Sequence, residues 1–70
     1  METYDVTLYV PINSIGPVTL WCRKHLREWR TVDETNEWLI IFDGATPDII
    51  AEVDRMSARL GVVVEMKLNV

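Results

Sequence analysis

Near both ends of the chain, apolar residues recur at every second position. Alternate positions from Tyr4 to Val10 are apolar, and Pro11 follows them. A period of two is typical of a half-buried strand, and proline ends such a strand readily. The same period returns at the other end, where alternate positions from Val62 to Val70 are apolar. The pattern therefore predicts a first strand that ends near Pro11 and a last strand over residues 62 to 70.

Two stretches between these strands carry helical signals. Residues 17 to 29 follow a loop with Asn, Ser and Gly, and Pro17 suits the first turn of a helix. In the second stretch, Thr46, Pro47 and Asp48 supply a cap, a proline at the first position and an acid in the first turn. Apolar residues then recur at helical spacing until Gly61, which is placed to end the helix. We expect one helix from Pro17 to about Trp29 and another from residue 47 to 60.

The segment between the helices predicts two further strands. Residues 30 to 33 form a short strand, residues 34 to 36 a turn, and residues 38 to 42 are apolar at every position, which is typical of a strand covered on both faces. The resulting order of strand, helix, strand, strand, helix, strand resembles the ferredoxin-like βαββαβ superfold, in which two helices cover one face of an antiparallel sheet. The alternative is a βαβαβ chain with three strands, in which residues 30 to 36 form a loop.

The resemblance implies which residues form the core and which face of the sheet stays open. The first and third strands would be central, and the core would hold the inward alternating positions of the strands together with Val18, Cys22, Leu26, Ile49, Val53, Met56 and Leu60. The open face would carry Asp5, Thr7, Tyr9, Val63 and Glu65, with either Trp38, Ile40 and Phe42 or Leu39 and Ile41. Either set leaves an exposed apolar patch, so we expect a second copy or a larger partner to cover it.

Length and composition set limits on the function. Seventy residues allow one small domain with little room for a deep cleft, and 49% hydrophobic with 26% charged residues is the balance of a folded domain. The single cysteine, Cys22, excludes an internal disulfide and favours a reducing compartment. The first ten residues lack the basic and apolar regions of a secretion signal, and no apolar stretch is long enough for a bilayer. We expect a cytoplasmic protein without a membrane segment.

The side chains that carry catalysis or bind metals are few. Cys22 and His25 are three residues apart on the apolar side of the first helix, where a core position explains both better than a nucleophile and its base. One cysteine and one histidine do not make a closed zinc site, and the acids near residues 33 to 37 lack the spacing of a calcium loop. We expect no catalytic residue, no metal and no cofactor, and predict that the protein is not an enzyme.

Positive charge is concentrated in one short stretch of an acidic chain. Residues 16 to 30 carry four basic side chains and one acid, a sum of +3, whereas the whole chain has a net charge of -4, so the remainder sums to -7. On a helix, most of these side chains fall on the face opposite the core, around an apolar residue. This pattern is typical either of a solvated face or of an interface with steering charges and an apolar anchor. The candidate partner-binding residues are Leu20, Trp21, Arg23, Lys24, Arg27 and Arg30, with Trp21 expected to be half exposed.

A basic helix also raises the question of nucleic acid. The residues LYVPIN, 8 to 13, resemble the first RNA-contact motif of RNA-recognition-motif domains, with Tyr9 at the aromatic position. The matching motif of the third strand should carry a basic residue, a glycine and two aromatics, whereas NEWLIIFD has acids at both ends. Because the acidic remainder also repels phosphates, RNA binding is an alternative and not the favoured hypothesis.

These observations favour a small non-catalytic protein-binding module, an inhibitor or adaptor of a larger protein complex, of the kind that phages and mobile elements encode. The main alternative is a ligand-sensing regulatory domain that acts as a homodimer, because small-molecule regulatory domains of the resembled fold bind at dimer seams. An acidic surface that imitates nucleic acid toward a basic target would be an alternative working surface. Its candidate residues are Asp33, Glu34, Glu37, Asp43, Asp48, Glu52 and Asp54.

Overall fold

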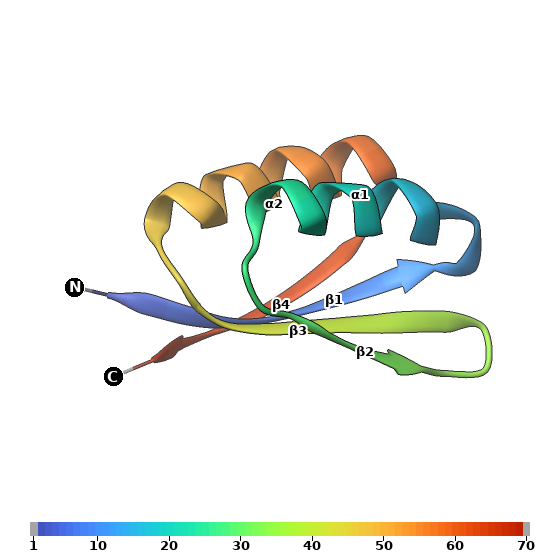
Figure 1. The fold of residues 1–70 in the computed structure, drawn as a ribbon, viewed down its shortest axis with the longest axis horizontal. Helices are drawn as coiled ribbons and strands as arrows, with labels where there is room; N and C mark the ends of the chain where they lie inside the picture. The colour runs from blue at the N-terminus through green and yellow to red at the C-terminus, as the bar shows by residue number, and fades with distance from the viewer. Residues whose placement is uncertain (1, 70) are drawn as a thin grey trace.

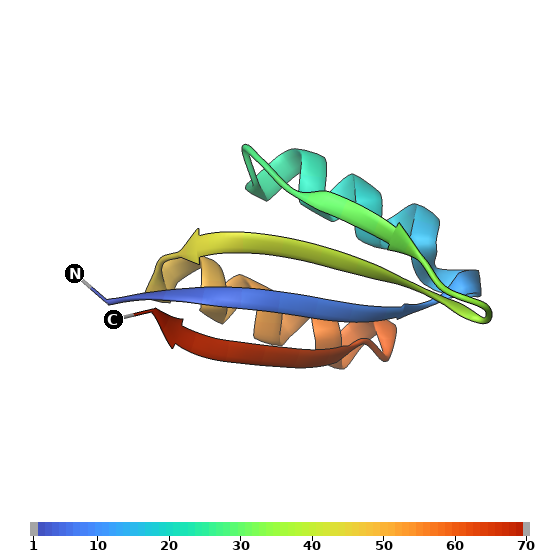
Figure 2. The ribbon, with the colours of Figure 1, turned by 90° about the horizontal axis from the view of Figure 1, so that it is seen from below.

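Two helices lie side by side on one face of a four-stranded antiparallel sheet (Figures 1 and 2). The computed structural model describes residues 2 to 69, so that Val70, expected in the last strand, lies outside the described residues. The chain is a small α+β domain whose elements follow the order strand, helix, strand, strand, helix, strand. These elements are β1 Thr3–Pro11, a 3-10 turn η1 Ile12–Ser14, α1 Ile15–His25, β2 Arg30–Asp33, β3 Glu37–Ala45, α2 Pro47–Leu60 and β4 Val63–Asn69.

The sheet has the strand order β2-β3-β1-β4, with β1 and β3 in the middle. The two long central strands pair from Tyr4 opposite Ala45 to Pro11 opposite Glu37, with an irregularity between Tyr4 and Val6. The short strand β2 pairs with β3 over all four of its residues. The alternative with three strands, in which residues 30 to 36 form a loop, is therefore wrong. Helix α1 covers the β2–β3 side of the sheet and α2 covers the β1–β4 side (Figure 2).

The strand register decides which side of β3 faces the helices. Val10, Leu8 and Val6 of β1 lie opposite Trp38, Ile40 and Phe42, and residues directly opposite in an antiparallel pair point to the same face. These six side chains point toward the helices, where Ile40 and Phe42 are buried. The other β3 side chains, Leu39 and Ile41, lie on the face without helices. This open face, seen from below in Figure 2, carries Arg30, Val32, Leu39, Ile41, Thr7, Tyr9, Val63 and Glu65 in its middle.

Helix α1 is shorter at its C-terminal end than its residue pattern predicts. It ends at His25, because Leu26 adopts an extended conformation (φ -115°, ψ 146°) while its N–H still donates to the Cys22 carbonyl oxygen. The early end frees Leu26 and Trp29 to pack against the core and lets the chain enter β2 at Arg30. The helix expected from Pro17 to Trp29 is thus wrong at both boundaries, since it begins at Ile15.

The structure confirms the predicted caps at both ends of helix α2. The Thr46 side-chain oxygen accepts a hydrogen bond from the Ile49 N–H, Pro47 stands in the first turn, and Gly61 ends the helix in the left-handed conformation at φ 68°. Neither helix, over residues 2 to 69, has the length and apolar character that crossing a bilayer requires.

The core fills the layer between the helices and the sheet. The predicted residues Val18, Cys22, Val53 and Met56 are fully buried in it, together with the inward side of β1. Two expectations are wrong. Trp21 is buried, at 7% exposure, because it points between the two helices. The inward positions Met66 and Leu68 of β4 are exposed, because β4 is an edge strand. The fully or nearly buried set is Val6, Leu8, Val10, Val18, Trp21, Cys22, Ile40, Phe42, Ala45, Val53, Met56 and Val62.

Candidate protein-binding groove

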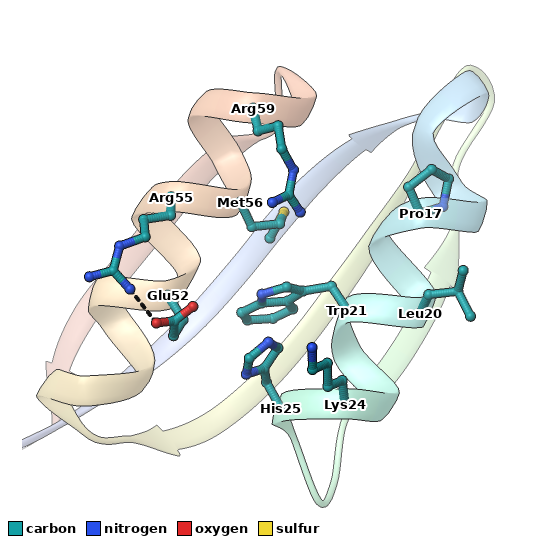
Figure 3. Close-up of a pocket in the computed structure, with 9 residues that line it drawn as sticks. All are labelled: Pro17, Leu20, Trp21, Lys24, His25, Glu52, Arg55, Met56 and Arg59. Carbon is teal, nitrogen blue, oxygen red and sulfur yellow. Dashed lines mark hydrogen bonds and ion pairs between the residues drawn. The ribbon is translucent and has the colours of Figure 1, made fainter.

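A groove of about 470 Å³ runs between α1 and α2 on the side of the helices that faces away from the sheet (Figure 3). Both helices contribute to it at intervals of three or four residues, which is the spacing that places side chains on one helical face. The lining residues are Pro17, Leu20, Trp21, Lys24 and His25 from α1 and Glu52, Arg55, Met56 and Arg59 from α2.

The floor of the groove is apolar. Trp21 and His25 project from α1 toward α2, with ring centroids 5.0 Å apart and ring planes tilted by 32°, and Met56 of α2 lies on the Trp21 side of this pair (Figure 3). Trp21 and Met56 are both buried, so Trp21 presents only an edge to the groove and Met56 lies almost wholly beneath its surface. Leu20 points away from α2 and is 65% exposed at the outer wall. This leucine therefore leaves apolar surface open to solvent next to the groove.

The walls of the groove are basic. Lys24 from α1 and Arg55 and Arg59 from α2 line it, against the single acid Glu52. Glu52 forms an ion pair with Arg55, three residues later on the exposed side of α2. Among residues 2 to 69 this is the one salt bridge, so Lys24 and Arg59 remain free to pair with an external anion. The groove sums to +2 without His25, in a chain whose net charge is -4.

The predicted partner-binding residues do not form one surface. Leu20, Trp21 and Lys24 line the groove, but Arg23 lies exposed on α1 outside it. Arg27 and Arg30 were expected on the basic face of the helix, and this expectation is wrong because α1 ends at His25. Arg27 stands in the following loop beside a second hollow, and Arg30 is the first residue of β2.

The predicted acidic surface is also divided. Asp33, Glu34 and Glu37 surround the β2–β3 turn at one end of the sheet, whereas Asp43 lies near the other end of β3. The three acids of α2 do not lie together either. Glu52 lines the groove, whereas Asp48 and Asp54 are exposed elsewhere on the helix. These acids are scattered over several faces, so no single acidic surface of all seven exists.

The sequence pattern missed half of the groove. Met56, Arg55 and Arg59 come from α2, whose residue pattern predicts a core position for Met56 and no binding role for the two arginines. Their signal was present as the spacing Glu52, Arg55, Met56, Arg59, which places a mixed polar and apolar stripe on one helical face. The stripe alone does not reveal that α1 lies opposite it.

The thiol of Cys22 lies in unreactive surroundings. Cys22 is fully buried, and burial raises the pKa of its thiol to about 11. Reactive cysteines show the opposite shift, because the thiolate is the nucleophile. In the part of the chain from residue 2 to 69, no three His, Cys, Asp or Glu side chains come close enough to hold a metal ion.

The groove is thus a feature that only the paired helices create, with an apolar floor, three basic side chains and one acid that already has a partner. Its chemistry fits a negatively charged segment that also carries an apolar side chain. Comparison with known proteins adds no relative: no family model, curated protein or solved structure matches this chain.

Proposed function

We propose that the protein is a non-catalytic protein-binding module that holds an acidic segment of a larger protein in the groove between α1 and α2. The observation that carries this proposal is the combination of Lys24 and Arg59, which lack an ion pair within the described residues, with the apolar floor of Trp21 and Met56. Such a module can act as an inhibitor or adaptor, because it occupies a target segment without changing it chemically.

Charge and shape together support this kind of partner. The basic walls attract an acidic segment and orient it along the groove, and charge complementarity of this type favours fast and specific association. Inside the groove the edge of Trp21 supplies apolar area for one side chain of the partner, and Leu20 adds exposed apolar area only at the outer wall. A volume of about 470 Å³ admits such an anchor but not a folded domain.

Nucleic acid fits the same groove less well. Proteins that bind single strands stack the bases on exposed aromatic faces. Trp21 is the aromatic residue of the groove with the largest ring, and at 7% exposure it has no free face for stacking. The chain as a whole is acidic, which opposes the neutralisation of many phosphates.

We also propose that the fold is of the ferredoxin-like type. The element order, the pairing of β2 with β3 and the central position of β1 and β3 support this assignment. The proposal concerns architecture only, since this superfold serves many unrelated functions.

The groove is tested with a labelled peptide in which a central Leu is flanked by Asp and Glu. Fluorescence anisotropy should show saturable binding to the wild type. Lys24→Glu or Arg59→Glu should weaken it about fivefold or more, because each reversal replaces an attraction by a repulsion. A peptide with Ala in place of the central Leu should bind about tenfold more weakly, because apolar contact is lost.

The matched control is Arg23→Glu, which makes the same charge change on the same helix outside the groove. It should leave binding within about twofold of the wild type, allowing for long-range charge effects. Equal weakening by Arg23→Glu and Lys24→Glu would show that only net charge matters and would contradict the proposal. Binding of an RNA oligonucleotide in preference to the peptide would favour the nucleic-acid alternative instead.

A further inference from the structure

The open face of the sheet carries an apolar row that crosses all four strands. The register places Val32 opposite Leu39, Leu39 opposite Tyr9, and Tyr9 opposite Val63, so the four side chains form one line from edge to edge. Val63 is 66% exposed and Val32 is 40% exposed. Both α1 and α2 lie on the opposite face (Figure 2). A continuous apolar row on an exposed sheet marks an interaction surface.

The neighbouring row on the same face has opposite charges at its two ends. It runs from Arg30 on β2 through Ile41 and Thr7 to Glu65 on β4. The positive end and the negative end thus lie at opposite edges of the sheet and at the same height along the strands. Glu65 also accepts a hydrogen bond from the Tyr9 hydroxyl, at 3.5 Å.

This arrangement is complementary to itself. When a second copy is placed face to face by a two-fold axis that runs along the strands, β2 of one copy lies over β4 of the other, and each row lies over the same row. Arg30 then faces Glu65 of the second copy, and Val32 faces its Val63. A two-fold axis across the strands places each strand over itself instead. With the axis midway between the two rows, Arg30 then faces the apolar Val32 of the second copy instead of its Glu65, so this second placement lacks the charge pairing of the first.

The middle of the face fits the same placement. Leu39 comes to lie over Tyr9 of the second copy, and Ile41 over its Thr7. The short side chain of Thr7 leaves a hollow of about 170 Å³, bounded by Ile41, Glu65 and Lys67 among others. Ile41 of one copy can therefore enter the hollow of the other, twice in the symmetric pair.

We propose that the open face is the contact between two copies of this chain, packed with their strands nearly aligned. The face spans four strands and about six residues along each central strand, which is roughly 19 Å by 20 Å, or about 400 Å² of projected area per copy. Standard interfaces bury about 800 Å² per partner, so the dimer is weak and forms at micromolar to millimolar concentration. Its two helical layers face outward in opposite directions.

Sedimentation equilibrium over this concentration range measures the association of the wild type, Arg30→Glu and Glu65→Arg. The symmetry repeats each contact, so each single reversal replaces two attractive pairs by two repulsive pairs. We expect the association constant to fall about tenfold or more. Mixing the two single variants, or combining both changes in one chain, re-creates opposite charges at both positions and should restore association.

The matched controls are Arg23→Glu and Asp54→Arg, which make the same charge changes on the exposed sides of the helices. They should leave the association constant within about twofold, and circular dichroism should show that every variant is folded. A wild type that stays monomeric at millimolar concentration overturns the proposal. So does an association that the single reversals leave unchanged, or one that they weaken and that neither the mixture nor the double variant restores.

Discussion

The chemical reactivity of Cys22 tests the packing of α1 against the sheet. Its thiol is fully buried in the core, and burial raises its pKa to about 11 from 9.0. At pH 8 a thiol with the ordinary value is ionised in about one molecule in ten, and one with a pKa of about 11 in about one in a thousand. Because the thiolate is the reactive form, ionisation alone slows the reaction with a disulfide reagent about a hundredfold.

Burial slows the reaction further, since the reagent reaches the sulfur only when the chain opens. A domain stable by about 5 kcal/mol is globally unfolded in roughly one molecule in five thousand. The rate of modification by Ellman's reagent at pH 8 should therefore be at least about a thousandfold lower in native buffer than in denaturant. The control is Ala58→Cys in a Cys22→Ala background, which places a thiol at an exposed position of α2 and should react quickly. A native rate within about tenfold of the denatured rate would refute the packing of Cys22.

The same raised pKa makes a prediction for alkaline stability. A thiol whose folded pKa lies above its unfolded value binds its proton more tightly in the native state. Its contribution to the free energy of unfolding is fully present below pH 9 and is lost between pH 9 and about 11. The loss is at most roughly 3 kcal/mol, from the difference between the two pKa values. Chemical denaturation at several pH values should show a smaller alkaline loss in Cys22→Ala than in the wild type.

Further predictions concern the core, two glycines and one tyrosine. Leu8→Ala empties a fully buried site in a central strand and should lower the free energy of unfolding by about 2–5 kcal/mol, measured by thermal or chemical denaturation. Gly61→Ala should lower the free energy of unfolding by about 1–2 kcal/mol, because Gly61 has a left-handed backbone at φ 68°. Gly16→Ala should raise the free energy of unfolding by about 0.4–1 kcal/mol, because Gly16 is in a helix with open space around it. The Glu65 carboxylate, and to a lesser degree burial, raise the pKa of Tyr9. Glu65→Gln should therefore lower the Tyr9 pKa, measured by an NMR titration of the phenol carbon. A Tyr9 pKa that this substitution leaves unchanged would contradict the contact.

The sequence pattern was sufficient for the elements whose signals are local. Alternation alone located β1 and β4, and β2 appeared at the residues expected, 30 to 33. Helix α2 was predicted from Thr46 to Gly61, because caps and glycine act on their own neighbours in the chain. The placement of β3 was correct, although it extends to Glu37 and Ala45.

The remaining features depend on contacts between distant segments. Residues 26 to 29 contain good helix formers, yet α1 ends at His25 because the chain must turn back to pair Arg30 with Ile41. Because residues 38 to 42 of β3 are apolar at every position, the sequence does not show which of its two faces lies against the helices. The groove could not be predicted because it exists only where α1 and α2 dock.

Chemical shift mapping by NMR tests the proposed groove most directly. The acidic peptide with its central Leu is titrated into isotope-labelled protein, and backbone amides and the indole N–H groups are followed. We predict that the Trp21 indole and the amides around Lys24, Met56 and Arg59 shift in a saturable manner, while those of the open sheet face do not. Shifts confined to the sheet face, or spread evenly over the basic residues outside the groove, would contradict binding between the helices.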